Sequence, residues 1–204
     1  MVVPVVADAD TLFGGTTRGL LIHLDYQGLI RLHWSPLILE EMSRALVRTR
    51  RKIDRAAAAG HEALMRGALP QAEVPTADVQ AQFQAIASAM RSAKDIHVAA
   101  CAHVLHVQHY YPDAAVVSLV TKNVRDFGVR KLATLGIEVQ RPDAFLLDLI
   151  ANDEPGVAAA FAALRDTLRS NPTPEQLLER LAADGQAGTA AALLAARQTG
   201  AVSL

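Results

Sequence analysis

The sequence contains a single cysteine, Cys101, among 204 residues. A lone cysteine excludes a disulfide within the chain and a zinc site built from several thiolates. Because Cys101 lies in an apolar run with helical character, we predict a buried and unreactive thiol rather than a nucleophile.

Aromatic residues and net charge are also scarce. Phe, Trp and Tyr together make up 4% of the chain, and the formal net charge is -1. Few aromatic rings argue against binding of a single strand by extensive base stacking. The absence of a global basic field means that any contact with nucleic acid would need a local basic patch.

Long apolar runs are missing as well. The N-terminal residues have neither a basic segment nor an extended apolar stretch, so they do not resemble a signal peptide, and no run has the length that spans a bilayer. We therefore expect a cytoplasmic protein with no membrane partner. What the chain does have is 51% hydrophobic and 20% charged residues, a balance that supports a globular core.

The most informative stretch is the start of the chain. Residues 2–7 are apolar on both faces, which is typical of a strand buried inside a sheet, and the run ends at Asp8 and Asp10. In parallel α/β sheets, ligands bind at the carboxyl ends of the strands. A single Asp there is commonly a turn or cap residue, but two at this spacing invite a hard cation such as Mg2+ or Mn2+.

Further strands alternate with helices along the chain. Residues 114–120 predict a second buried strand, which is followed by Thr121, Asn123 and Asp126, and residues 137–139 predict a third. Residues 29–34 form a short strand or an extended connector. Helices are predicted at 16–27, 36–46, 76–90, 93–109 and 144–150. A further Ala-rich helix follows the basic residues 44–55 and ends at about residue 69. This alternation predicts an α/β fold, a sandwich with a mainly parallel sheet.

A basic segment covers residues 44–55, where six Arg and Lys side chains accompany one acid, Asp54. Such a run is either a solvated helix face or a patch that contacts phosphates, and the sequence leaves both open. The four histidines between His97 and His109 have no fixed metal-ligand spacing, so we favour structural or surface roles for them.

After a break at residues 152–156, the tail has three Ala/Leu-rich helical segments, at 157–169, 174–183 and 189–198. We therefore predict an α/β domain at residues 1–150 and an all-helical C-terminal extension at residues 151–204. The tail itself contains no recognisable chemistry.

Five segments in order resemble the PIN-domain ribonucleases, most closely the VapC-type toxins of bacterial toxin–antitoxin pairs. The segments are residues 6–12, 34–41, 94–100, 120–127 and 136–146. The resemblance covers about residues 2–150. It implies a PIN-like three-layer α/β/α sandwich and a metal-dependent endoribonuclease, the toxin of a type II pair.

The resemblance also implies the site. Asp8, Glu41 and Asp95 match the metal-binding acids of the family, and they would act in catalysis together with Asp126. The fourth ligand position holds Asn123 rather than the usual Asp. The sequence leaves open whether Asn123, Asp126 or both bind the metal. Asp10 and Thr121 would not bind the metal directly but would orient the residues or the water that do. The candidates for RNA phosphate contacts are Arg44, Arg48, Arg51, Lys122 and Arg125.

Crowded carboxylates repel one another, and divalent cations relieve that repulsion, which is why Mg2+ or Mn2+ is the expected cofactor. The implied partners are an RNA substrate, a cognate antitoxin protein and a second copy of the chain in a homodimer.

Two other functions stay open. Residues 5–12 also resemble the first motif of haloacid-dehalogenase-like phosphatases, in which Asp8 would be the nucleophile and Asp10 a general acid. The downstream Lys and paired acids of that family are not recognisable here. Alternatively, the chain is a PIN-like binding module with weak or no catalysis, a possibility that Asn123 makes more plausible.

Overall fold

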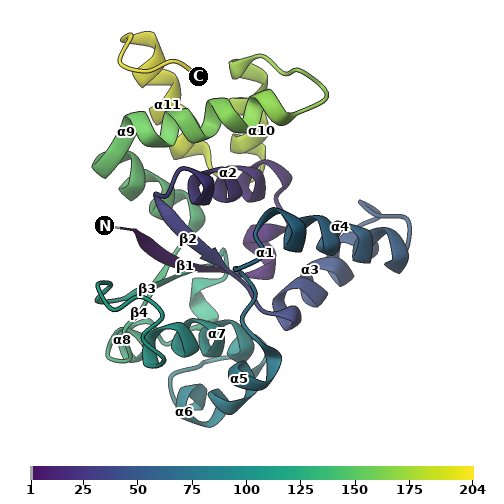
Figure 1. Ribbon diagram of the computed structural model, residues 1–204, viewed down its shortest axis with the longest axis vertical. Helices are drawn as coiled ribbons and strands as arrows, with labels where there is room; N and C mark the ends of the chain where they lie inside the picture. The colour runs from purple at the N-terminus through teal and green to yellow at the C-terminus, as the bar shows by residue number, and fades with distance from the viewer. Residues whose placement is uncertain (1) are drawn as a thin grey trace. The chain divides into compact units, whose positions relative to one another are not determined.

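In the computed structural model, which describes residues 2–204, the apolar run near the start of the chain forms β1 (Val3–Ala7). Val5, Val6 and Ala7 are completely buried. β1 lies inside an all-parallel sheet with the strand order β2-β1-β3-β4 (Figure 1). The other strands are β2 (Ile30–His33), β3 (Val117–Val120) and β4 (Ile137–Gln140).

The pairing of β1 with β3 joins residues that are more than a hundred positions apart in the sequence. Val5 lies opposite Ser118, and Ala7 lies opposite Val120, so the two strands end level with each other. Because both strands run in the same direction, the polar residues that follow Ala7 and Val120 emerge at one edge of the sheet. The predicted α/β class with a mainly parallel sheet and a C-terminal helical region is confirmed.

The chain divides into two compact units. Unit 1 is the chain up to Phe13 together with Arg31–Gln140, and unit 2 is Gly14–Ile30 together with Arg141–Leu204. The predicted domain boundary at residue 150 stays a prediction. It falls within α9 (Pro142–Thr167), which is kinked at Asp153, in the segment where a break was predicted. Pro155 inside the helix accounts for the interruption.

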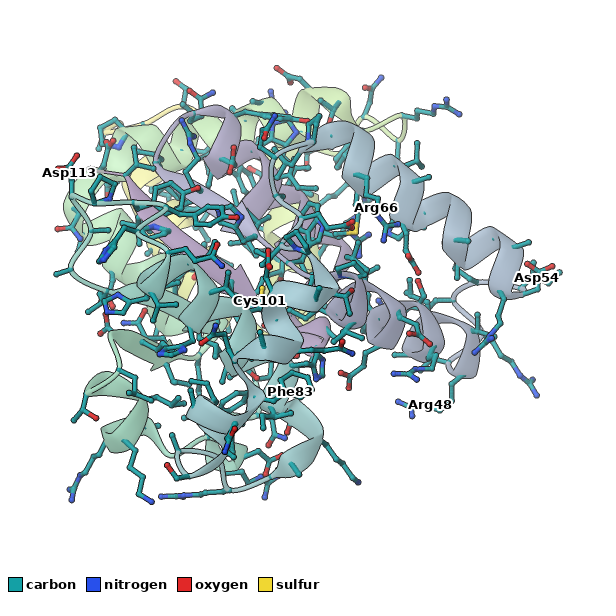
Figure 2. All side chains as sticks on the ribbon, turned by 60° about the horizontal axis from the view of Figure 1, so that its bottom comes forward. Arg48, Asp54, Arg66, Phe83, Cys101 and Asp113 are labelled. Atoms are coloured by element: carbon teal, nitrogen blue, oxygen red, sulfur yellow. The ribbon has the colours of Figure 1, made fainter. Side chains whose placement is uncertain are left out.

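In unit 1, α7 packs against β1, β3 and β4 and is buried along most of its length. Cys101 is fully buried in this helix, as predicted, and burial raises the pKa of its thiol (Figure 2). The helices of unit 1 are α1 (Ala9–Leu12), α3 (Pro36–Arg48), α4 (Arg55–Ala68), α5 (Thr76–Ala81), α6 (Phe83–Ala87), α7 (Ile96–Val107) and α8 (Val129–Ala133). Two short 3-10 helices are η1 (Ala93–Asp95) and η2 (Val124–Asp126).

Three expectations about unit 1 are corrected. The helix predicted at 76–90 is two short helices that meet at Gln82. The strand predicted at 114–120 begins only at Val117. The helix predicted at 93–109 starts as the 3-10 turn η1 and becomes α-helical at Ile96. A short turn outside the periodic pattern divides the first element and delays the start of the other two.

The start of α3 follows the predicted signals closely. Ser35 caps the helix by accepting a hydrogen bond from the Ile38 N–H, and Pro36 occupies the first turn. Ile38, Leu39 and Met42 are completely buried. This apolar face fixes the rotation of the helix, and Glu41, half-buried, is consequently held at the margin of the buried face.

Unit 2 contains α2 (Gly15–Tyr26), α9, α10 (Pro174–Ala183) and α11 (Ala187–Gln198), so the predicted helical tail is confirmed. Acidic side chains cap two of its helices across the unit. Asp184 accepts hydrogen bonds from the Thr16 and Thr17 N–H groups at the start of α2. Asp143 accepts from the N–H groups of Gly188 and Thr189 at the start of α11.

None of the helices formed by residues 2–204 has both the length and the apolar composition required to cross a membrane.

Candidate functional site

Asp8 comes directly after β1 and is held rigidly there. Its side chain caps α1 by accepting a hydrogen bond of 2.6 Å from the Ala9 N–H, and the Thr121 hydroxyl donates to its other oxygen at 2.7 Å. Asp8 is 5% exposed and Thr121 is completely buried. Because Thr121 follows β3, the neighbouring strand, the pairing of the two strands positions the carboxylate from both sides.

The ionised form of Asp8 is disfavoured in this position. Burial raises its pKa to about 7, and the negative charges of Asp10 and, more weakly, Glu41 add to the increase, while the hydrogen bond from Thr121 opposes it. A carboxyl group with this pKa in a folded protein is a candidate for function, since most structural carboxylates are stabilised in their charged form.

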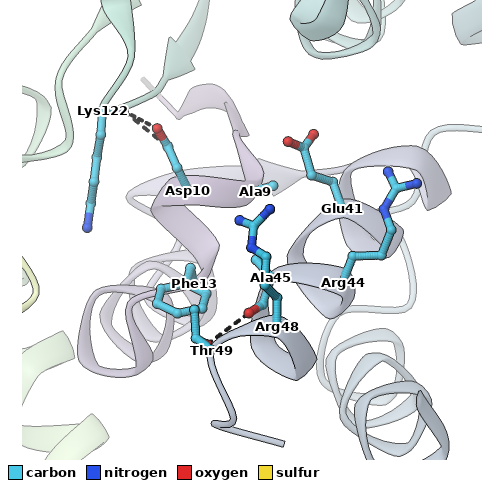
Figure 3. A pocket seen from close by; sticks show the side chains of 9 residues that line it. All are labelled: Ala9, Asp10, Phe13, Glu41, Arg44, Ala45, Arg48, Thr49 and Lys122. Atoms are coloured by element: carbon cyan, nitrogen blue, oxygen red, sulfur yellow. Dashed lines mark hydrogen bonds between the residues drawn. The ribbon is translucent and has the colours of Figure 1, made fainter. Parts of the chain in front are cut away.

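Asp10 lies two residues further along the chain, in the first turn of α1, and its carboxylate is bonded to the residue that follows Thr121. It accepts hydrogen bonds from the Lys122 N–H at 3.0 and 3.1 Å (Figure 3). The Thr11 hydroxyl also donates to it, at 3.1 Å. Burial raises the pKa of Asp10, although these hydrogen bonds oppose the shift. Asp10 is thus hydrogen-bonded to the backbone that follows β3.

Glu41 reaches the same region from α3. Its carboxylate lies 3.2 Å from His97 Nε2, and this contact is the largest cause of a lowered Glu41 pKa. Burial opposes protonation of His97, but Glu41 and the charge of Asp8 outweigh it, so the pKa of His97 is raised. His97 was predicted to have a structural or surface role, and the structure gives it a partner in the acidic site.

Asp95 and Asp126 form the remaining part of the cluster. Asp95 ends η1 just before α7, and burial together with the neighbouring carboxyl of Asp126 raises its pKa, with a further contribution from Glu41. The Asn123 side-chain amide donates a hydrogen bond to Asp126. The residue that precedes α8 is Gly128, so Asp126 does not cap that helix, and its carboxyl group interacts with Asp95.

Glu41 therefore raises the pKa of both Asp8 and Asp95, which means that these three predicted acids share one electrostatic site within unit 1. Their oxygen donors have the hard chemistry that suits Mg2+ or Mn2+, and their mutual repulsion is the condition that a cation relieves. Within residues 2–204, no three His, Cys, Asp or Glu side chains stand at metal-ligand spacing. The donor chemistry fits a divalent cation, and the assignment of individual ligands stays a prediction.

The basic candidates divide into two groups. Arg44, Arg48 and Lys122 line an open pocket of about 590 Å3 together with Asp10 and Glu41 (Figure 3). Figure 2 shows Arg48 reaching outward from the end of α3.

Arg51 and Arg125 are engaged differently. The guanidinium of Arg51 lies 4.3 Å from the centre of the Phe13 ring and donates to the Phe13 carbonyl at 3.3 Å. Arg125 donates from Nε to Asn123 at 3.4 Å and does not line this pocket. Of the five predicted phosphate contacts, three are thus collected around the acids.

Residues 142–195 match the family model of the VapC50 C-terminal domain. The match is consistent with the VapC-type toxin family. It begins at the start of α9 and ends within α11, so it supports the predicted VapC-type resemblance through the helical tail and independently of the acidic site. The match covers about a quarter of the chain. No curated protein and no solved structure matches the chain.

Two contributors to the acidic site were not identified from the sequence. His97 pairs with Glu41, and Phe13 lines the pocket beneath Arg51. His97 follows Asp95 by two residues at the start of a helix, a spacing that is a weak signal on its own. Phe13 carries no polar group, so only its position in the fold relates it to the site.

Proposed function

We propose that the protein is a metal-dependent endoribonuclease that cleaves RNA phosphodiester bonds and acts as the toxin of a type II toxin–antitoxin pair. The observation that carries this proposal is the acidic cluster at the carboxyl edge of a parallel sheet, where the charge of Glu41 raises the pKa of both Asp8 and Asp95. The match of the C-terminal helices to a VapC50 domain supports it from a separate part of the chain.

The roles of the residues follow from their positions. Asp8, Glu41 and Asp95, with Asn123, Asp126 or both, would hold Mg2+ or Mn2+, which would supply Lewis-acid activation of the phosphate and of the attacking water. Thr121 fixes the orientation of Asp8 through its hydroxyl hydrogen bond. Asp10 holds the turn after β3 in place through the Lys122 N–H.

Substrate binding is proposed for the basic side of the same pocket. Arg44, Arg48 and Lys122 line it beside Asp10 and Glu41, so positive charge is available next to the acids. A phosphodiester backbone carries negative charge at every nucleotide and is attracted by such a local patch even when the net charge of the protein is near zero.

The decisive experiment is cleavage of single-stranded RNA by the purified protein with Mg2+ or Mn2+, and after removal of the metal with a chelator. We expect cleavage that needs the metal and that is lost in Asp8→Ala. Cleavage that persists unchanged in Asp8→Ala would refute the proposal. A generic phosphomonoester is assayed in parallel. Hydrolysis of this substrate that requires Asp8 would favour the phosphatase alternative.

The toxin part of the proposal is tested in cells. Expression should arrest growth, Asp8→Asn should relieve the arrest, and a small protein encoded beside the toxin gene should neutralise it. A homodimer is proposed from the same family resemblance. Sedimentation measures the mass of the protein in solution and tests it. Growth that is unaffected by the wild-type protein, with RNA cleavage intact in vitro, would leave the nuclease and reject the toxin role.

A further inference from the structure

A second pocket shares a wall with the acidic one. It has a volume of about 540 Å3, and both Glu41 and Arg44 line the two pockets. The common wall is one face of α3, since Leu37, Glu41, Arg44 and Arg48 follow at spacings of four, three and four residues. At a rise of 1.5 Å per residue, this face is about 16 Å long from Leu37 to Arg48. A ligand that binds along it would pass through both pockets.

The lining of the second pocket differs from that of the first. Leu37, Phe83 and Ile96 contribute apolar surface, and all three are half-buried rather than sealed in the core. Phe83 is the first residue of α6 (Figure 2). Among residues 2–204, no other aromatic ring stacks on the Phe83 ring and no cation lies over it. The ring of Phe13 in the first pocket, by contrast, is covered by Arg51 at 4.3 Å.

Polar groups stand at the same pocket. The amide of Gln80, on the exposed side of α5, offers both donors and an acceptor, and Lys94 and Arg44 add positive charge. An aromatic ring, an amide and cations are the groups that recognise, respectively, the face of a base, its edge and the adjoining phosphates. Arg44 lies 3.6 Å from the carboxylate of Glu40, which also lines the pocket, so a purely apolar peptide segment would leave the amide and Lys94 without a counterpart.

The floor of this pocket connects directly to the acidic site. His97 lines the pocket and contacts Glu41 at 3.2 Å. The negative charge of Glu41 in turn acts on Asp8 and Asp95 and raises the pKa of both. A base held in the second pocket would therefore lie beside the predicted position of the scissile phosphate.

We infer that the pocket formed by Leu37, Gln80, Phe83, Lys94 and Ile96 is a base-binding subsite, which holds one unstacked base of an RNA strand next to the acidic site and sets the sequence preference of cleavage. The inference rests on the proposed ribonuclease function and names the part of the substrate that the enzyme reads. The low aromatic content of the chain is compatible with it, because a single ring serves a single base.

The test uses a pool of single-stranded oligoribonucleotides of random sequence, with the cleavage positions read by sequencing the products. The variants are Phe83→Ala, Phe83→Trp and Gln80→Ala, and Gln84→Ala is the matched control because Gln84 is exposed on α6 and does not line the pocket. We expect a base preference next to the cleaved bond in the wild type that Phe83→Ala and Gln80→Ala flatten. Phe83→Trp and Gln84→Ala should preserve it.

A binding measurement accompanies the cleavage assay. The Asp8→Asn variant is titrated into fluorescent homopolymer oligoribonucleotides of A, C, G and U, with and without Phe83→Ala, and thermal unfolding is recorded for each variant. Loss of one stacked base, worth about 1–3 kcal/mol, corresponds to binding that is about 5- to 150-fold weaker.

The outcomes separate the subsite from the nuclease. A base preference that Phe83→Ala and Gln80→Ala leave unchanged, with RNA still cleaved by the wild type, overturns the subsite and leaves the nuclease standing. RNA binding that depends on Phe83 without any cleavage by the wild type supports the subsite and overturns the nuclease. Absence of both cleavage and Phe83-dependent binding overturns both, and the pocket is then free to hold a protein segment.

Discussion

In unit 2, Asp143 and Asp184 each accept hydrogen bonds from backbone N–H groups at the start of a helix. In unit 1, Asp8 and Asp95 also lie at helix starts, but each of them faces other carboxyl groups, and the pKa of each is raised by burial and by those neighbours. The same side chain therefore stabilises the fold in one unit and accumulates unfavourable charge in the other. Carboxylates that cost stability are retained where chemistry needs them.

The largest expected effect concerns catalysis. Glu41→Gln and Asp95→Asn should each lower RNA cleavage by more than about 100-fold, because each removes a carboxylate from the proposed metal-binding site. Asp143→Asn is the matched control in unit 2 and should leave the cleavage rate per folded molecule unchanged. Initial rates at saturating Mg2+ measure the effect, and equal losses in all three variants would erase the distinction between the two sets of acids.

The next effect concerns stability. Asp143→Ala should lower the free energy of unfolding by about 2–4 kcal/mol, because it removes the acceptor for the Gly188 and Thr189 N–H groups and for the Thr189 hydroxyl. Urea denaturation followed by circular dichroism gives the value. A loss below about 0.5 kcal/mol would mean that α11 does not depend on this cap.

The third effect concerns pH and has the opposite sign to the usual behaviour of an Asp. The folded-state pKa of Asp8 is raised from 3.8 to about 7, so the folded protein retains a proton that the unfolded chain releases, and stability falls as the pH rises from about 4 to 7. Asp8→Asn removes this dependence. In the presence of a chelator, the variant should be more stable than the wild type above pH 7, by on the order of 2 kcal/mol.

The gap between Asp8→Asn and the wild type should close near pH 4, where both the folded and the unfolded wild type carry the proton. Unfolding in urea at several pH values tests this. A gap that is constant from pH 4 to 8 would show that the carboxyl group of Asp8 ionises in the folded protein as it does in the unfolded chain.

The smallest effect concerns the basic side of the pocket. Arg48→Ala should weaken RNA binding at low salt and reduce the slope of the logarithm of the binding constant against the logarithm of the salt concentration by about 1, the value for one phosphate contact. Arg169→Ala, an exposed arginine of unit 2, is the control. Slopes that change equally in both variants would assign the effect to net charge rather than to this pocket.

Local patterns in the sequence were sufficient for much of the fold. The apolar run at residues 2–7 predicted β1 because only a strand inside a sheet buries both of its faces, and Ser35 with Pro36 predicted the start of α3. The short turns were not predictable in the same way. Gln82 divides one predicted helix into two, and the residues around it show no break in the helical pattern.

The candidate acids were found partly from local pattern and partly from the family resemblance. Asp8 and Asp10 are conspicuous because charged residues follow directly after a buried strand. Glu41 and Asp95, by contrast, are individually ordinary residues near helix starts, and the resemblance was needed to assign them to the same site as Asp8. Phe83 gave no signal, because an isolated aromatic residue at the start of a short helix is common in any globular chain.

The sequence by itself determined which segments are buried, where the main helices begin and that acids follow the strands, since these features depend on residues within a few positions of one another. Only the tertiary structure decided that Thr121 holds Asp8, that Glu41 meets His97, and that the segment from Gly14 to Ile30 joins the C-terminal helices in one compact unit. These contacts join residues far apart in the chain, and their energies depend on burial and on charges that no local pattern contains.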